Sequence, residues 1–108
     1  MNTKNFKFSL MGDEWQVEFV DVIEDTEAND ELVYGRCFFD SQTIMIARKS
    51  KNGKSFSDKV LQRTLLHEMT HAIFGEGCYT ASNNDEPLVE WTARCLQDIL
   101  KVADKLKL

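Results

Sequence analysis

Apolar and polar residues alternate along the first twenty positions of the chain, and this two-residue period predicts β-strands. Apolar side chains recur at alternate positions within residues 6–10 and again within residues 15–19. Residues 11–14 between these runs include Gly12 and Asp13, which are typical of turns. The pattern therefore predicts a β-hairpin with one apolar face.

A second pair of strands is predicted after an acidic segment. Residues 22–31 carry many carboxylates and little that could be buried, which predicts a solvated loop. Residues 32–39 and 42–48 are rich in β-branched and aromatic side chains, and Asp40 and Ser41 separate them. These two runs are therefore predicted to pair across a short turn.

The apolar period lengthens to that of an α-helix in residues 57–75. Ser57 or Asp58 at the start can accept a backbone N–H as the N-cap. Gly75 and Gly77 stand where a left-handed C-cap is expected. The segment is therefore predicted to be a helix that ends at these glycines.

A second helix is predicted over residues 86–105, because polar residues and then Pro87 mark a loop that turns into a helix. The order of strands followed by helices predicts one α+β domain spanning residues 1–108. We expect a small, largely antiparallel sheet with both main helices packed on one face.

Both histidines of the chain lie in one motif, His67-Glu68-x-x-His71. Residues four apart lie on the same face of a helix, so both imidazoles can bind one Zn²⁺. Glu68 points about 100° round the helix, where it can reach a metal-bound water without ligating the metal. The motif predicts two zinc ligands and a general base.

A zinc site that keeps one position open for water needs a third protein ligand. No histidine remains, so the ligand must be Asp, Glu or Cys. Glu86 and Glu90 lie one turn apart on the second helix. Glu90 is preferred, because the small Ala93 one turn later favours close approach of the two helices, and Glu86 is the alternative. Cys78, just beyond the first helix, is a weaker substitute.

His67-Glu68-x-x-His71 followed by Glu90-x-x-Ala93 resembles the pattern of the gluzincin metallopeptidases. Among these, the chain is most similar to small prophage-encoded enzymes of the ImmA/IrrE type and to the minigluzincins. The resemblance implies a zincin-like fold, a zinc site completed by Glu90, and a peptide or protein substrate. It also implies a cytoplasmic location in a bacterial or phage-infected cell.

The resemblance covers residues 32–100 and carries two further expectations. In zincins a strand near the metal helix can pair with an extended substrate, and residues 43–48 are the candidate strand. Arg94 stands where the family pattern often has Asp or Asn. If that side chain supports a zinc-bound histidine, this chain must support it in another way.

The chemistry expected of this site is hydrolysis of a peptide bond by a zinc-bound water. Glu68 would accept the proton of the water and return it to the leaving amine. The oxyanion needs a hydrogen-bond donor besides the metal, and Tyr34, Tyr79 and Arg94 are the candidates.

Composition and net charge argue against some classes of partner. The apolar content of 43% and charged content of 29% are typical of a soluble globular protein. The net charge of −5 argues against non-specific binding of nucleic acid, and no apolar run reaches the length of a membrane span. The cysteines are odd in number and no signal peptide precedes them, so reduced thiols are expected, with Cys37 and Cys95 in the core.

The sequence therefore predicts a zinc-dependent metallopeptidase. The alternative, a zincin-like zinc-binding module that recognises a protein partner without cleaving it, stays open, since a fold alone does not decide function. Retention of Glu68 favours the enzyme, because a purely structural zinc site has no need for a base. The oligomeric state is left open.

Overall fold

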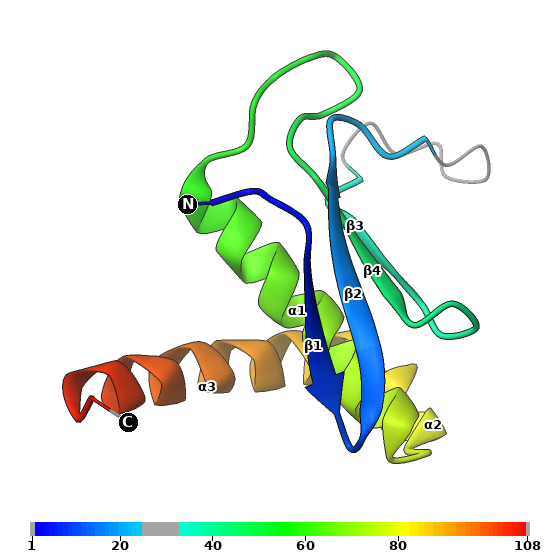
Figure 1. Ribbon diagram of the computed structural model, residues 1–108, viewed down its shortest axis with the longest axis vertical. Coiled ribbons are helices and arrows are strands. Elements are labelled where there is room, and N and C mark those ends of the chain that lie inside the picture. The colour runs from blue at the N-terminus through cyan, green and yellow to red at the C-terminus, as the bar shows by residue number, and fades with distance from the viewer. Residues whose placement is uncertain (1, 25–32, 108) are drawn as a thin grey trace.

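The predicted α+β class is confirmed by a computed structural model, which describes residues 2–24 and 33–107. The N-terminal half forms a four-stranded sheet, and helices follow in the C-terminal half (Figure 1). In chain order the elements are β1 (Phe6–Leu10), β2 (Asp13–Val20), β3 (Gly35–Phe38), β4 (Thr43–Ala47), α1 (Asp58–Glu76), α2 (Thr80–Asn83) and α3 (Glu86–Lys105).

Both predicted strand pairs are present in the sheet, whose order is β1-β2-β4-β3. β1 pairs with β2 and β3 pairs with β4, each antiparallel, as the alternation of apolar residues indicates. Met11 and Gly12 join β1 to β2 with φ angles of 52° and 86°, the positive values that a tight two-residue hairpin turn requires. The parallel pairing of β2 with β4, which joins the two hairpins, was not predicted.

The position of β4 corrects the expectation that residues 43–48 offer a free edge to a substrate. β4 has hydrogen-bonded neighbours on both sides, β2 and β3. A strand with both edges paired cannot accept a further strand. Among the described strands, β3 is the outermost on this side of the sheet.

The core lies between the sheet and α1. Trp15, Val17 and Phe19 alternate along β2 and are almost fully buried, because every second side chain of a strand points to the same face. Ile44 and Ile46 of β4 complete this layer. The α1 side chains that contact it include Leu61 and Ala72.

The acidic segment predicted as a solvated loop lies mostly outside the described residues, which omit 25–32. At its start, Ile23 is buried, so this part of the prediction is wrong. Ile23 packs with Val33 and Ala47 in a second, smaller apolar cluster. Burial of a single isoleucine side chain contributes about 1.5–3 kcal/mol.

Helix α1 begins as predicted and ends differently. Ser57 is the N-cap, and its side chain accepts a hydrogen bond from the backbone N–H of Val60 at 3.3 Å. At the other end, Gly77 is the C-cap with a right-handed φ of −82°, and the left-handed residue is Cys78 at +60°. The prediction of a left-handed glycine at this end is therefore wrong.

Gly75 has a packing role inside the last turn of α1 rather than a capping role. A Cβ atom at this position would come within 2.0 Å of Cε1 of the Phe39 ring. Phe39 in turn meets Trp15 edge to face, with ring centroids 5.9 Å apart. The absence of a side chain at Gly75 thus lets the turn after β3 close onto α1.

Helix α3 has the predicted bounds but a different partner. Asp85 caps its start by accepting a hydrogen bond from the N–H of Leu88 at 3.1 Å, and Pro87 lies in the first turn. α1 packs against β3 and β4, whereas α3 packs against α1 and α2 (Figure 1). The expectation that both helices cover one face of the sheet is therefore wrong. Among the described residues, none of the helices combines the length and apolarity needed to span a bilayer.

Candidate metal centre

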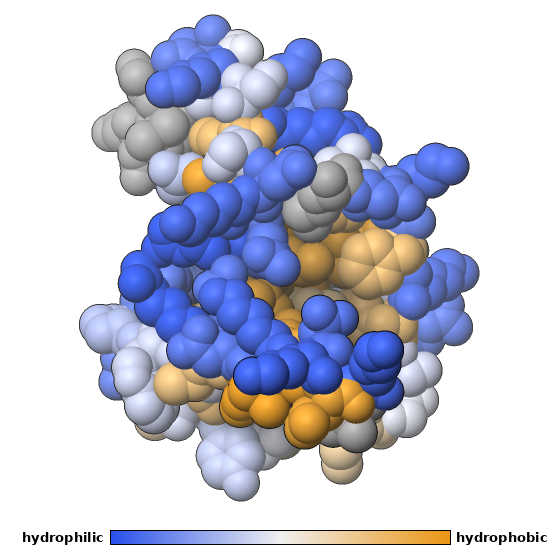
Figure 2. Space-filling view, turned by 90° about the vertical axis from the view of Figure 1, so that its left-hand side faces the viewer, coloured by the Kyte–Doolittle hydropathy of each residue, from blue (hydrophilic) through white to orange (hydrophobic). Residues whose placement is uncertain are grey.

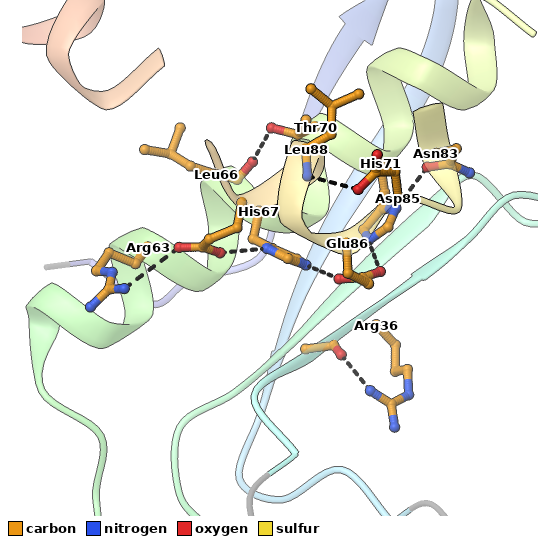
Figure 3. Close-up of polar contacts among 12 residues, drawn as sticks. Arg36, Arg63, Leu66, His67, Thr70, His71, Asn83, Asp85, Glu86 and Leu88 are labelled. Carbon is orange, nitrogen blue, oxygen red and sulfur yellow. Dashed lines mark hydrogen bonds and ion pairs between the residues drawn. The ribbon is translucent and has the colours of Figure 1, made fainter. Parts of the chain in front are cut away.

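A cleft of about 570 Å³ opens between α1, α3 and the start of β3. α1 contributes His67, Glu68 and His71, and the first two turns of α3 contribute Glu86 and Glu90. The crossing of α3 over α1 brings these side chains together from positions about twenty residues apart (Figure 3). The motif residues predicted from sequence therefore lie in one concave site.

Three potential ligand groups converge in this cleft. One carboxylate oxygen of Glu86 lies 3.0 Å from Nε2 of His67, and the other lies 3.0 Å from Nε2 of His71 (Figure 3). The ligand atoms of the three residues all lie within 4.8 Å of one another. His67, His71 and Glu86 are thus positioned to bind a metal ion.

The opposite nitrogen of each imidazole is held by a hydrogen-bond acceptor. Nδ1 of His67 donates to the Glu90 carboxylate at 2.8 Å, and Nδ1 of His71 donates to the side-chain carbonyl of Asn83 at 2.7 Å. A neutral imidazole that donates through Nδ1 has a lone pair on Nε2. Both Nε2 lone pairs then face carboxylate oxygens of Glu86, and acceptors at such distances need a cation or a proton between them. The donor set therefore fits a divalent metal.

The two glutamates take different positions relative to the histidines. Glu86, the alternative, meets both Nε2 atoms, whereas the preferred Glu90 meets Nδ1 on the far side of the His67 ring. The two carboxylates are one helical turn apart, so the crossing point of the helices decides which of them reaches the Nε2 side. Ala93 is buried as expected for a close helix contact, but that contact does not select Glu90 as a ligand.

Glu90 is the acidic residue that contacts Nδ1 of His67 in place of the family's side chain at position 94. Its second carboxylate oxygen accepts from Nε of Arg94 at 3.1 Å and lies 3.5 Å from Nη2 of Arg63. Partial burial raises the pKa of Glu90, but the hydrogen bonds with His67 and Arg94 outweigh it, and the net pKa is below its usual value. An ionised Glu90 can therefore orient His67, so the chain has an acidic support for this histidine one turn before Arg94.

Asn83 is a site residue that the sequence did not single out. It lies at the end of the short helix α2, which was also not predicted. The signal for it is weak, because an Asn-Asn-Asp run before a helix is typical of any polar loop. Its contact with His71 completes a symmetrical arrangement in which both rings are fixed from behind.

Glu68 is the most buried acidic side chain of the cleft, with only 7% of the residue exposed. Burial raises its pKa above the usual value. Positive charge on His67 and His71 acts in the opposite direction, Glu86 adds to the increase, and Arg36 lowers it. Glu68 does not belong to the cluster of ligand atoms that His67, His71 and Glu86 form.

The carboxylate of Glu68 has room because β3 passes α1 at a glycine. A Cβ atom at Gly35 would lie 2.8 Å from Cγ2 of Thr64, 3.1 Å from Cγ of Glu68 and 3.1 Å from the carbonyl oxygen of Met45. Real Cβ atoms essentially never make the first of these contacts. The close approach of strand to helix at this point therefore requires glycine.

Replacing Gly35 with alanine is expected to lower the free energy of unfolding by about 1–3 kcal/mol, the usual cost of overpacking. Chemical denaturation of the two proteins measures this difference. Adding Thr64→Ser, which removes the nearest methyl group, should recover part of the loss. An alanine variant as stable as the parent would show that strand and helix separate freely here.

The predicted oxyanion donors are divided by the fold. Tyr34 and Arg94 line the cleft, whereas Tyr79 lies beyond the end of α1, outside the cleft lining, with its ring against Gly77. The ring of Tyr34 packs against Phe56 with centroids 4.9 Å apart, which fixes its position at the cleft wall. The sequence did not single out two further lining residues with N–H donors, Arg36 and Arg63.

The cysteines take no part in the ligand cluster. All three are free in the structure. Cys78 is exposed and is not among the grouped ligand atoms of the described residues. Burial, and then the charge of Glu68, raises the pKa of Cys37 to about 12, so this thiol stays protonated and packs against the core. Cys95 is half-buried on α3.

Comparison of the chain with protein-family models, with curated proteins and with solved structures finds no match.

Proposed function

We propose that the chain is a zinc-dependent metallopeptidase of the gluzincin type, with His67, His71 and Glu86 as the zinc ligands. The observation that carries the proposal is the convergence of both Nε2 atoms on one carboxylate while both Nδ1 atoms are held by acceptors. Two imidazoles and one carboxylate form a ligand set typical of catalytic zinc, which keeps a position open for water or substrate. The buried Glu68 beside them supplies a base.

The catalytic roles follow from the placement of the side chains. Zinc, when bound, polarises a substrate carbonyl and makes a water molecule acidic near neutral pH. Glu68 accepts a proton from the attacking water and passes it to the leaving amine. Glu90 and Asn83 hold the two imidazoles in orientation from behind. Tyr34, which lines the cleft and is fixed against Phe56, is the proposed donor to the oxyanion.

The substrate is proposed to bind as an extended peptide along the open edge of β3. The carbonyl of Tyr34 accepts from the N–H of Ala47 in β4, and backbone groups of alternate residues in an antiparallel strand point to opposite edges. The backbone groups of Gly35 and Cys37 therefore face the open edge, next to the cleft. Arg36 donates to the carbonyl of Gly35, and a peptide that pairs here would compete for this acceptor.

The alternative proposal is a zinc-binding module without peptidase activity. One support for it was the replacement of the family's acidic or amide side chain by Arg94. The contact between Glu90 and Nδ1 of His67 removes that support, because an acidic partner for the histidine is present in another place. The retained base and the open cleft favour the enzyme, and a cleavage assay separates the two proposals.

The direct test is a cleavage assay on unfolded proteins with the zinc-loaded chain. We expect fragments to appear with zinc and to be lost after chelation, and the variants His67→Ala and His71→Ala to bind no stoichiometric zinc. Metal analysis and mass spectrometry of the fragments measure both results. Full zinc content in the double histidine variant would overturn the site, whereas zinc binding without cleavage of any substrate would favour the binding module.

A further inference from the structure

Helix α3 carries a second apolar stripe whose side chains are mostly exposed. Val89 and Ala93 are buried against α1, but Ile99, Val102 and Leu106 are 60%, 57% and 63% exposed. By the helical period, these three lie on average about 130° round the helix from the buried pair. In Figure 1 the C-terminal half of α3 extends away from the sheet, and the face in Figure 2 has apolar surface at the height of α3.

The spacing of this outer stripe is that of a coiled-coil seam. Thr92, Cys95, Ile99, Val102 and Leu106 alternate steps of three and four residues, which is the a/d pattern of the heptad repeat. The apolar part of this pattern, from Cys95 to Leu106, becomes buried when the side chains of a partner helix fill the spaces between them. The stripe is therefore better suited to contact with a second helix of the same pattern than to exposure to solvent.

The charges beside the stripe favour a particular partner. In this heptad frame Asp98 and Lys105 occupy successive g positions, and both are exposed. Consider an antiparallel pair in which Ile99 lies opposite Val102 of a second copy. Asp98 then lies opposite Lys105 of that copy, and the two-fold symmetry gives the same contact a second time. A parallel pair would lack this complementarity, because its g positions face e positions, here the apolar Leu96 and Ala103.

We propose that α3 forms an antiparallel two-stranded coiled coil with α3 of a second copy of this chain. The seam consists of Cys95, Ile99, Val102 and Leu106, with Asp98 paired to Lys105 across the symmetry axis. Glu86 and Glu90 lie on the opposite flank of the α1-facing stripe, so the metal cleft stays open in the dimer. The proposal stands independently of the proposed peptidase activity.

The oligomeric state in solution tests the proposal. Sedimentation equilibrium from micromolar to submillimolar concentration should show a monomer–dimer equilibrium. Ile99→Glu places a charge in the seam from both copies and should raise the dissociation constant at least about a hundredfold. Lys101→Glu introduces the same side chain on the outer side of the helix and should leave it within about threefold. Metal content, measured in parallel, should be equal in all three proteins.

A charge reversal distinguishes the antiparallel arrangement. Asp98→Lys and Lys105→Asp should each weaken self-association about tenfold, because two attractive pairs become repulsive. An equimolar mixture of the two variants should recover the affinity of the parent, since each copy then offers the opposite charge. A parent chain that is monomeric throughout, or Ile99→Glu with unchanged association, would overturn the proposal. Dimers without recovery in the mixture would overturn the antiparallel pairing.

Discussion

Replacement of Glu86 by glutamine is expected to lower the affinity for zinc about a thousandfold, because it removes one of three protein ligands. The same replacement at Glu90 is expected to lower it only about ten- to a hundredfold, the usual effect of losing a hydrogen-bond partner behind a ligand. The difference follows from geometry: Glu86 faces Nε2 of both histidines, whereas Glu90 faces Nδ1 of His67 alone. Both changes keep the size of the side chain and its helix.

Competition with a chromophoric chelator measures both affinities on one scale. Glu14→Gln is a matched control, because Glu14 lies on β2, is exposed and contacts Lys7 rather than the cleft. Its zinc affinity should equal that of the parent. A larger loss for Glu90→Gln than for Glu86→Gln would restore the ligand order that the sequence favoured, with Glu86 as a charge at the start of α3.

The positions of helices and hairpins could be predicted from the sequence because their signals are local. Ser57 caps α1 through an N–H three residues away, and Pro87 stands in the first turn of α3. The turn at Met11 and Gly12 needs only its own two positive φ angles. Each of these features is determined within a few residues, so the observed bounds differ little from the expected ones.

The arrangement of these elements could not be predicted in the same way. The parallel pairing of β2 with β4 joins strands from different hairpins, and the alternation within each strand says nothing about its second neighbour. The apolar face of α3 indicates that the helix packs on something, but not that its partner is α1 rather than the sheet. Contacts between distant segments decide both features.

The ranking of Glu86 against Glu90 depends on contacts between distant segments in the same way. The sequence places both carboxylates on one face of α3, one turn apart, and periodicity cannot rank them. A shift of one turn along the axis is about 5.4 Å, larger than any ligand distance, so the crossing point of α1 and α3 determines the ligand. Asn83 was missed because its role depends on the same crossing, which brings α2 behind His71.

Glu68→Gln is expected to abolish peptide cleavage, with a loss of about a thousandfold or more, while zinc binding and fold persist. The amide keeps the shape of the side chain but accepts no proton at neutral pH, and a general base contributes about 10²–10⁴-fold to the rate. Zinc should be retained, because Glu68 is outside the cluster formed by His67, His71 and Glu86. The fold should be at least as stable, because a neutral amide costs less to bury than a carboxylate, and only 7% of residue Glu68 is exposed.

Three measurements on the Glu68→Gln variant test this prediction. Metal analysis should give the parent's zinc content, thermal unfolding should give an equal or higher midpoint, and the cleavage assay should give no fragments. Loss of zinc together with activity would make Glu68 a ligand and would overturn the division of roles within the motif. Cleavage at the parent's rate would place the base elsewhere in the cleft. The burial of Glu68 beside Gly35 would then reflect packing alone.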